Sequence, residues 1–464
     1  MRDIEHAPPM PSRIFIDATY TITSGRNSGI ERVVRRLWDG TQVVAAAQGL
    51  PIPQLIINHN GNFYPADSSF IAQAASLGQR HRNILATTPR LYRLLASAMC
   101  HMTASQQLRK LLLPQAGHLG VFKLGHSLRQ AAFLRRYTRK SQPLRAHVGD
   151  LLFLPDAYWS HRLQKSVWPA AAAARQSGAF VCTMLYDLIP LTHPEFVGAK
   201  RRDAFLNYVT QAATNSDMLL AISKTVCDQV REFLPTIATS DDRFCSDIRS
   251  FQLGAELGGA QAVDSQDVRP HVQHAMGGPL SPYLMVATFD PRKNHPYLLD
   301  AFDRLWDAGH DVRLCLVGRI GARCDELVDR IRLHRELGQR LFLFEDLSDA
   351  ELHFCYQHAR GVIFPSIVEG YGLPIVESLW FRKRTFVSDT PIHREVGGGD
   401  CSYFDLSQVE TLVQQVVQWE ATLDSGREID LPTRRPTTWR ESSQQALSAC
   451  LHAMRPRMGE QRAA

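Results

Sequence analysis

Short apolar runs alternate with longer stretches of helical spacing along most of this chain. In the first half, the apolar runs predict buried strands at 13–19, 54–60, 150–156, 180–187 and 217–223. In the second half, the same pattern predicts strands at 283–288, 312–318, 340–345, 361–366 and 384–389. Strands that alternate with helices are typical of parallel sheets with crossover helices. The pattern therefore predicts an α/β protein with two doubly wound, Rossmann-like domains.

The chain is too long for a single core. Its 464 residues exceed what one hydrophobic core usually serves, so two or more domains are expected. The stretch 257–280 is rich in small and turn-forming residues and has no clear period, which is typical of a linker. We therefore expect an N-terminal domain over 1–256 and a C-terminal domain over 281–430, facing each other across a cleft.

Composition narrows the class of protein only slightly. With 44% hydrophobic and 21% charged residues and a formal charge of +6, the chain has ordinary globular statistics. Its nine cysteines form no Cys-x-x-Cys pair and no Cys/His spacing suited to zinc, which argues against a disulfide framework or a structural metal site and favours a reducing cytoplasm. The first residues lack the apolar run of a secretory signal, and no apolar stretch is long enough to cross a bilayer. Any membrane contact is expected to be peripheral.

One segment, 68–149, has an unusual charge. It contains no Asp or Glu but thirteen cations: Arg80, Arg82, Arg90, Arg93, Arg109, Lys110, Lys123, Arg129, Arg135, Arg136, Arg139, Lys140 and Arg145. Apolar residues interleave with them at helix-like spacing, which is typical of an interfacial helix that anionic lipid attracts. We therefore predict a basic helical insertion that binds an anionic membrane surface through 80–145. The alternative is a solvated helical excursion, and nucleic acid ranks last because no nucleic-acid motif accompanies the charge.

The loops after the predicted strands are the places to look for chemistry, because open parallel sheets bind ligands at the carboxyl ends of their strands. After the first strand, Gly25 and Gly29 loosen the backbone ahead of a helix that begins near Ile30. Such a loop can approach a ligand closely. A plain tight turn explains the same glycines equally well.

Two adjacent cations, Arg292 and Lys293, follow the strand predicted at 283–288 and precede a predicted helix. Helix starts normally favour acids, because the N-terminal end of the dipole is positive. Placing Arg and Lys there costs stability unless an anion compensates their charge, and a phosphate would do so. The alternative is that both side chains point to solvent, as most Arg and Lys do.

The stretch SIVEGYGLPIVESLW adds two carboxylates, Glu369 and Glu377, around a turn that starts a helix. Gly370 and Gly372 let the backbone approach a ligand, and the proline that follows suits a first helical turn whose free N–H groups favour a diphosphate. Glu377 is expected in that first turn, where it can accept hydrogen bonds from a ribose diol, while Glu369 can reach a sugar's hydroxyls. For Glu377 alone, the alternative is complementation of the helix dipole.

These motifs resemble those of a known enzyme family. The segments VATFDPRKNHPYLLDAF, LVGRIG, LSDAELHFCYQHARGVIFPSIVEGYGLPIVESLW and VSDTPIHREVGGGDCSYFD are similar, in order and spacing, to the retaining GT-B glycosyltransferases of the large family four, the glycosyl transferases group 1. The likeness covers nearly all of 281–405. In the first domain, IDATYT, SGIERVV, LYDLIPLTHPEF and LAISKTVCDQV more loosely resemble a mannosyltransferase-like subgroup that builds bacterial surface polysaccharides. The segment 437–450 resembles the family's last helix, so 431–464 is expected to cross back to the first domain.

The resemblance implies a role for each matching residue. Arg292 and Lys293 would hold the donor's diphosphate and Glu369 would contact the transferred sugar. Glu377 would bind the ribose. The rest of the donor site would consist of Asn294, Gly318, Arg319, Gly370, Tyr371, Gly372 and Leu373, the last four directing backbone N–H groups to the pyrophosphate.

On the side of the first domain the match is less complete. The resemblance assigns Gly29 and Tyr186 to the loops that meet the acceptor or the diphosphate. Many relatives have His-Asp where this chain has Tyr186-Asp187, so the role of the histidine does not transfer. Asp187 is then the candidate for a catalytic contact on the acceptor side. The alternative is that Asp187 caps its own loop before Pro190.

The resemblance implies a retaining hexosyltransferase of bacterial O-antigen, capsule or exopolysaccharide biosynthesis. The favoured donor is GDP-mannose, although UDP- and dTDP-sugars bind the same frame, and the acceptor would be a lipid-linked or growing saccharide. The sequence contains no Asp-x-Asp, so the cations are expected to replace a metal, and no cofactor is expected. The enzyme is expected on the cytoplasmic face of the inner membrane. The alternatives are a GT-B-fold nucleotide-sugar epimerase and a catalytically degenerate membrane-associated scaffold.

Overall fold

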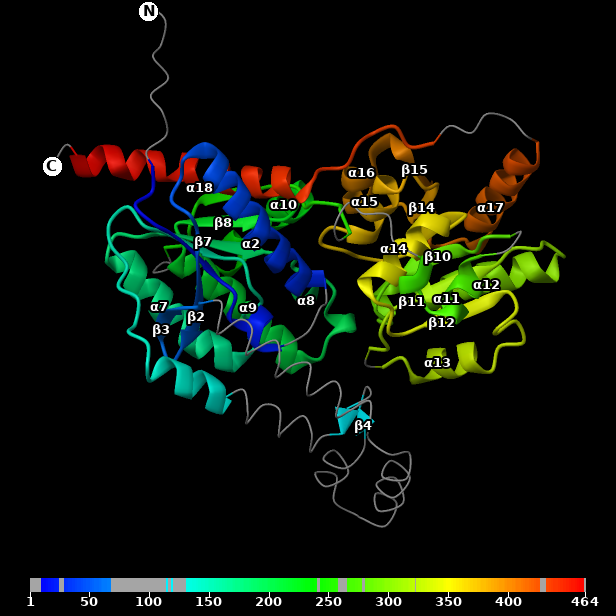
Figure 1. Cartoon of the computed structure of the whole chain (residues 1–464), viewed down its shortest axis with the longest axis horizontal. Coiled ribbons are helices and arrows are strands. Elements are labelled where there is room, and N and C mark those ends of the chain that lie inside the picture. The colour runs from blue at the N-terminus through cyan, green and yellow to red at the C-terminus, as the bar shows by residue number, and fades with distance from the viewer. Residues whose placement is uncertain are drawn as a thin grey trace, which may run out of the picture.

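The computed structural model describes residues 10–24, 29–67, 114–115, 118–119, 131–239, 243–257, 265–277, 280–321, 323–425 and 431–462. Over these residues the chain forms two α/β domains that lie side by side, each built on its own sheet (Figure 1). The chain enters the second domain once and returns to the first through its last helix. The predicted fold class is confirmed.

The first domain is built on a seven-stranded sheet with the order β3-β2-β1-β6-β7-β8-β9. Neighbouring strands are parallel except β2 and β3, which pair antiparallel. The five predicted strands of this half are confirmed. β3 and β9 are additional, because short edge strands such as NFYP and DIRS carry no long apolar run. The strands are β1 (Ile14–Asp17), β2 (Gln54–His59), β3 (Asn62–Pro65), β6 (Leu151–Leu154), β7 (Phe180–Leu185), β8 (Met218–Ala221) and β9 (Asp247–Ser250).

Both faces of this sheet are covered. Ile14 and Ile16 of β1 belong to one buried cluster and Phe15 to another, because successive side chains of a strand point to opposite faces. A strand buried on both faces is a continuous apolar run, which explains why the sequence pattern found it. The helices of this domain are α1 (Thr19–Ser24), α2 (Gly29–Gln48), α7 (His161–Gln176), α8 (Ile189–Thr192), α9 (Ala199–Asn215) and α10 (Lys224–Ile237).

The second domain has a six-stranded, all-parallel sheet with the order β12-β11-β10-β13-β14-β15. Its five predicted strands are confirmed, and a further strand lies at one edge. The strands are β10 (Tyr283–Val286), β11 (Leu314–Val317), β12 (Leu341–Phe344), β13 (Gly361–Phe364), β14 (Thr385–Ser388) and β15 (Cys401–Phe404). The helices are α12 (His295–Asp307), α13 (Asp325–Arg332), α14 (Asp349–His358), α15 (Leu373–Trp380), α16 (Pro391–Gly397) and α17 (Val409–Asp424).

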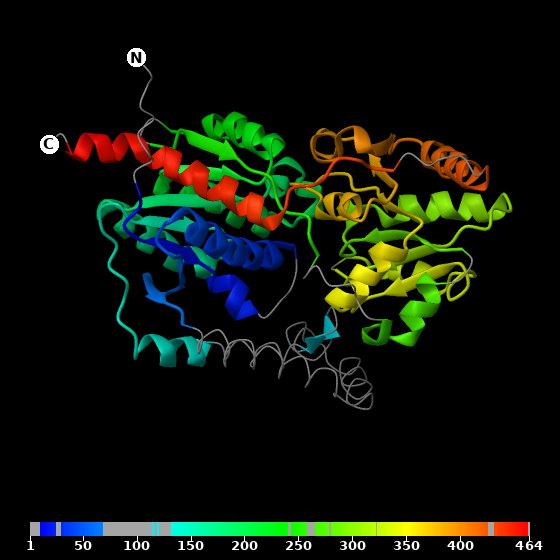
Figure 2. The ribbon, with the colours of Figure 1, turned by 45° about the horizontal axis from the view of Figure 1, so that its top comes forward.

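Two segments connect the domains. The stretch 257–280, expected as a linker, includes a short helix, α11 (Pro270–Met276), which packs in the core of the second domain. The second connection leads into α18 (Trp439–Arg462), which packs along α2 of the first domain, as the likeness to the family's last helix predicts (Figure 2). The connections are bonded to each other, since the backbone N–H of Ala255 donates to the carbonyl of Thr437 at 2.9 Å.

Most of the basic segment 68–149 lies outside the described residues. The described part of this segment includes two short paired strands, β4 (Pro114–Gln115) and β5 (His118–Leu119). A helix over 131–138 is described. Leu134 is buried against Ile57 and Tyr64 of the first domain, while the cations that follow are exposed: Arg135, Arg136, Arg139, Lys140 and Arg145. The amphipathic pattern is confirmed here, but the apolar side packs within the domain and the cations face outward. No described helix is both long and apolar enough to span a membrane.

Candidate active site

The loop after β10 makes a tight turn before the next helix begins. The side chain of Asp290 accepts the backbone N–H of Arg292 at 3.2 Å, and Pro291–Lys293 form a 3-10 turn, η3. Asn294 then takes the left-handed conformation, with φ 57°, which asparagine adopts more readily than most residues. This turn fixes the two predicted cations at the carboxyl end of the second sheet.

Both cations bind the carboxylate of Glu369. Arg292 Nη1 donates to one oxygen at 2.8 Å, and Lys293 Nζ donates to the other. Glu369 and Lys293 are buried, and the Lys293 ammonium also lies 5.0 Å from the centre of the Phe364 ring. Arg292 further donates to the backbone carbonyl of Val368 at 3.2 Å. Two motifs that are remote in the sequence therefore form one charged cluster, the Arg292-Lys293-Glu369 cluster.

Burial and mutual attraction together set the charges of this cluster. Burial opposes the charge of Glu369, but the two cations outweigh burial and hold its pKa at about 2. For Lys293, burial outweighs the carboxylate and lowers the pKa to about 8. Burial also opposes the charge of Arg292, yet the carboxylates of Glu369, Asp187 and Asp290 raise its pKa overall. At neutral pH the three side chains of the cluster therefore carry one net positive charge.

Asp187 brings a carboxyl group to this cluster from the first domain, where it follows β7. Burial raises the pKa of Asp187, although the nearby guanidinium of Arg292 opposes the shift. Its Oδ1 accepts the backbone N–H of Ile189 at 3.0 Å, so Asp187 also caps its own loop. The structure thus contains the local contact of the alternative interpretation and keeps the carboxyl group within electrostatic range of the cations.

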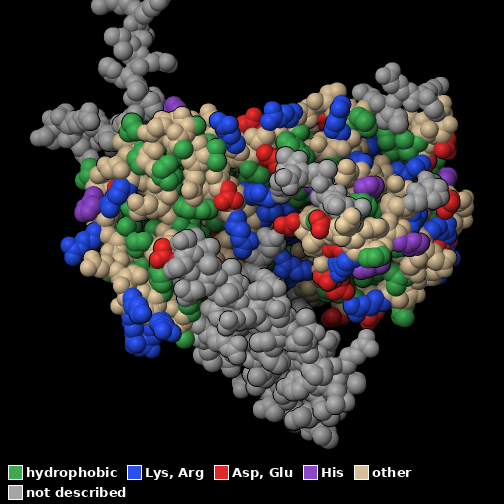
Figure 3. Space-filling view, in the orientation of Figure 1, with side chains coloured by type: hydrophobic (Ala, Val, Ile, Leu, Met, Phe, Trp, Pro, Cys, Tyr) green, Lys and Arg blue, Asp and Glu red, His purple; other side chains and the backbone are tan. Residues whose placement is uncertain are grey.

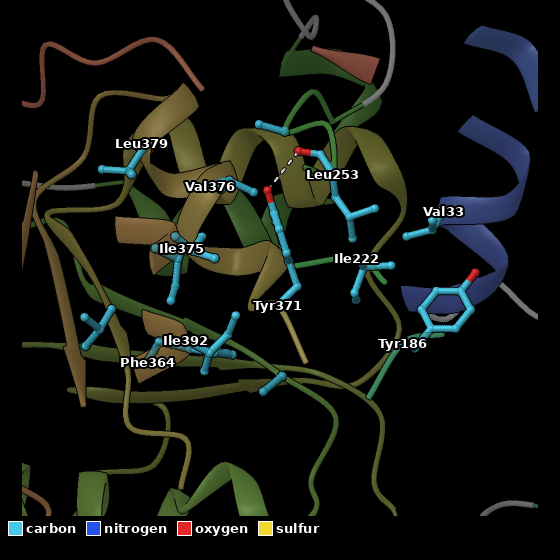
Figure 4. Packing of buried hydrophobic residues seen from close by; sticks show 14 of the residues in the cluster. Val33, Tyr186, Ile222, Leu253, Phe364, Tyr371, Ile375, Val376, Leu379 and Ile392 are labelled. Carbon is cyan, nitrogen blue, oxygen red and sulfur yellow. Dashed lines mark hydrogen bonds between the residues drawn. The ribbon is translucent and has the colours of Figure 1, made fainter. Parts of the chain in front are cut away.

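The Gly-Tyr-Gly loop packs directly against the first domain. A Cβ at Gly370 would collide with the carbonyl oxygen of Tyr186, and Ser223 Oγ donates to the carbonyl of Gly370 at 2.9 Å. Tyr371 is buried, and its hydroxyl donates to the carbonyl of Leu253 at 3.1 Å (Figure 4). Figure 4 shows apolar side chains of both domains around this loop. The close approach of the two domains therefore requires the first glycine of the motif.

Glu377 lies one turn deeper in its helix than the sequence indicated. Gly372 adopts the left-handed φ of 96° and α15 begins at Leu373, so Glu377 belongs to the second turn and the expected first-turn position is wrong. Its carboxylate accepts a hydrogen bond from the hydroxyl of Tyr356 at 2.7 Å. It also forms an ion pair with Nη2 of Arg32, on α2 of the first domain. Because the helix dipole acts mainly within the first turn, these partners account for the position of the acid better than the dipole does.

The remaining predicted residues lie around these groups. Gly318 directly follows β11, and a Cβ there would collide with the backbone just after β10; Arg319 beside it is exposed. Gly29 is the first residue of α2, and among the described residues no atom outside its own stretch of backbone lies within 4 Å of where its Cβ would be, so no close approach to them requires a glycine there. Tyr186 is buried and donates its hydroxyl to the carbonyl of Pro155 at 2.7 Å, so its backbone, and not its hydroxyl, faces the second domain.

Other contacts between the domains had no signal in the sequence. Glu395 of α16 accepts the backbone N–H groups of Lys224 and Thr225, each at 2.7 Å, and thereby caps α10 of the other domain. The ion pair between Arg32 and Glu377 is a second such contact. Figure 3 shows basic and acidic side chains gathered where the two domains meet. Hydrophobic periodicity cannot reveal these pairs, because each joins helices that belong to different domains.

A second pair of carboxyl groups is buried within the first domain. Asp17 ends β1 and accepts hydrogen bonds from Thr19 Oγ1 and from the hydroxyl of Tyr158, each at 2.5 Å. Asp156 follows β6 and accepts the backbone N–H and the hydroxyl of Thr21, both at 2.9 Å. Burial raises the pKa of Asp17 to about 7, with Asp156 adding to the shift, and burial raises the pKa of Asp156 to about 6. This pair ties α1 to the sheet. The family-like segment IDATYT contains Asp17, Thr19 and Thr21, but nothing in it indicated a pairing with Asp156.

One protein family and several characterised proteins match parts of this chain. Residues 279–404 match the family described as Glycosyl transferases group 1. The serotype-specific mannosyltransferase WbdA of Escherichia coli is 27% identical over 277 residues, which are 58% of this chain and 33% of that protein. The O-antigen chain mannosyltransferase B of Escherichia coli is 24% identical over 355 residues, which are 73% of this chain and 86% of that protein. The chain thus covers about a third of the length of the first relatives it matches.

Solved structures share the fold at low sequence identity. The crystal structure of Anabaena Alr3699/HepE in complex with UDP and glucose gives a TM-score of 0.51 at 13% identity, over 97% of this chain and 99% of that one. Sucrose-phosphate synthase from Thermosynechococcus elongatus gives 0.51 at 15% identity, over 97% and 98%. At these identities the likeness concerns the fold alone. Residues 279–404 therefore form a domain of the glycosyl transferases group 1 family, carried in a GT-B fold of two Rossmann-like domains.

Proposed function

We propose that this chain is a retaining glycosyltransferase of bacterial surface polysaccharide biosynthesis, which moves mannose from GDP-mannose onto a lipid-linked or growing saccharide. The observation that carries the proposal is the Arg292-Lys293-Glu369 cluster at the carboxyl end of the second sheet, beside Asp187 of the first domain. The mannosyltransferases among the relatives support the choice of sugar and pathway.

The cluster suits the charge that develops in glycosyl transfer. Breaking the bond between the anomeric carbon and the phosphate oxygen leaves negative charge on the diphosphate, which Arg292 and Lys293 are positioned to stabilise. Glu369 orients both cations, and its remaining lone pairs can accept hydrogen bonds from the hydroxyls of the sugar. The departing phosphate oxygen then takes the proton of the acceptor hydroxyl, which attacks from the face that the diphosphate leaves. This course preserves the configuration at the anomeric carbon.

The two cations take the part that a divalent metal has in other glycosyltransferases. Their net positive charge is available to the diphosphate at neutral pH, and the sequence has no Asp-x-Asp to bridge a metal to it. Losing one such donor should lower the rate about a hundredfold or more, as in oxyanion-hole deletions. Transfer should persist in EDTA, and full inhibition by EDTA that manganese reverses would overturn this part of the proposal.

The membrane part of the proposal is electrostatic. The exposed cations that follow Leu134 support attraction to anionic lipid at the cytoplasmic face of the inner membrane. Flotation with vesicles should need anionic lipid and should weaken as salt is added. Absent flotation, or flotation that does not respond to salt, would return this segment to the solvated-surface interpretation.

The test of the function begins with thermal shifts. A bound donor stabilises the folded state by mass action, so one among GDP, UDP, dTDP and ADP and their sugar conjugates should raise the melting temperature without added metal. The sugar of that donor, radiolabelled, should then enter a lipid-linked product, and Glu369→Ala should abolish the transfer. An epimerised nucleotide sugar without acceptor product would identify an epimerase. Neither shift nor product would favour the scaffold.

A further inference from the structure

Arg32 is paired with the carboxylate of Glu377, to which the resemblance to group 1 glycosyltransferases assigns the ribose of the donor. It lies one turn into α2, and its Nη2 forms an ion pair with Glu377 Oε1 across the domain boundary. The other oxygen of Glu377 accepts the hydroxyl of Tyr356 at 2.7 Å. The side chain of Glu377 is 3% exposed and that of Arg32 is 22% exposed. Arg32 therefore covers Oε1 of Glu377, and a ribose hydroxyl can take this place when Arg32 moves away.

We infer that Arg32 is a donor-binding residue of the first domain, which keeps the ribose position on Glu377 in the free enzyme and turns to the phosphates of the nucleotide when the ribose binds. The inference rests on the proposed function, because it takes Glu377 as the ribose ligand. It adds a phosphate ligand from the domain opposite Arg292 and Lys293.

Arg32 is expected to move to the phosphates because its positive charge needs a new counter-ion once the ribose binds Glu377. A ribose diol is neutral, so it can satisfy the oxygens of Glu377 but leaves the guanidinium of Arg32 without its counter-ion. An uncompensated charge at a largely buried position is strongly unfavourable. In a nucleoside diphosphate the 5′ carbon joins the ribose directly to the α-phosphate, so the same ligand brings oxyanions within reach of a long side chain. A guanidinium also matches phosphate oxygens in geometry, since it can donate two parallel hydrogen bonds.

The competing interpretation is that Arg32 only ties the domains together. Other contacts already do so: Glu395 caps α10, and Ser223 donates to the carbonyl of Gly370 at 2.9 Å. The two interpretations differ in how a ligand responds to the loss of Arg32. Loss of a simple tie changes the affinities for nucleoside and nucleoside diphosphate alike, whereas loss of a residue that changes partners weakens only the binding of the diphosphate.

The experiment compares a nucleoside with its diphosphate by calorimetry without metal, using the base found by thermal shift. Arg32→Ala should raise the dissociation constant of the nucleoside diphosphate by about tenfold or more, since the substitution removes a charge-assisted hydrogen bond. The same variant should bind the nucleoside as tightly as the wild type or more tightly, because Arg32 no longer covers Glu377. Arg32→Lys keeps the charge without the fork and should lie between wild type and Arg32→Ala for the diphosphate. If Arg32→Ala fails to fold, this variant carries the test.

Arg36→Ala is the matched control. Arg36 lies one turn further along α2, where its charge acts on Asp39, and its loss should change neither affinity. An equal change for both ligands in Arg32→Ala, no change for either, a loss confined to the nucleoside, or a gain for the diphosphate would overturn the inference alone. Wild-type protein that binds no nucleotide would overturn the proposed function and this inference with it.

Discussion

The pKa of Lys293 makes donor binding depend on pH in a way that can be calculated. Burial lowers this pKa from 10.5 to about 8 in the free protein. A bound diphosphate would add negative charge beside the ammonium and raise its pKa again. Between pH 7 and 9 the cationic fraction of Lys293 in the free protein falls from about 91% to about 9%. The dissociation constant of the nucleoside diphosphate should therefore rise about tenfold over that range.

Calorimetry at several pH values measures this effect directly. At pH 9 the wild-type protein should take up about 0.9 proton when the nucleoside diphosphate binds, which titrations in buffers of different ionisation enthalpy reveal. Lys293→Arg keeps the positive charge at every accessible pH, so its affinity should stay nearly constant and its proton uptake should be near zero. A thermal melt checks that the larger side chain is accommodated beside Phe364.

The nucleobase supplies an internal control. A base that loses a proton in alkaline solution weakens binding equally in both proteins, so only the difference between wild type and Lys293→Arg reports on Lys293. Parallel affinity curves for the two proteins, or no weakening of nucleotide binding by the wild type up to pH 9, would contradict this prediction. Either result would mean that Lys293 is not a titrating ligand of the diphosphate.

Three further predictions concern the contacts around the site. Gly370→Ala places a Cβ against the carbonyl of Tyr186, so the domains should separate, with a larger radius of gyration in small-angle scattering and loss of transfer; full activity would contradict the proposed close approach. Glu395→Ala removes the cap of α10 and should lower the free energy of unfolding by about 0.5–2 kcal/mol in urea, with no loss expected if water replaces the cap. Asp17→Asn removes a carboxyl whose folded pKa of about 7 exceeds the unfolded value of 3.8. In the wild type, the proton on Asp17 stabilises the fold fully below pH 4, and this contribution is lost as the pH rises through 7. The variant lacks this contribution, so between pH 4 and 7 its free energy of unfolding should fall by up to roughly 4 kcal/mol less than that of the wild type. Thermal melts at several pH values measure the difference.

Local patterns along the chain were enough to find the strands of both sheets wherever they are buried on two faces. Runs such as those at 150–156 and 283–288 are apolar throughout, and a local pattern suffices to find them. It also placed Arg292 and Lys293 at the carboxyl end of a strand, because strand order along the chain needs no knowledge of packing. Edge strands such as β9 and β15 escaped prediction because they are short and partly polar.

Which charged groups meet depends on how the folded domains pack together. Arg292 and its partner Glu369 are 77 positions apart in the sequence, and Arg32 and its partner Glu377 are 345 positions apart. Such pairs depend on how two domains close on each other, and helical or strand periodicity records only which face of an element is buried. The position of Glu377 in the second turn of α15 likewise follows from the left-handed conformation of Gly372, directly before the helix.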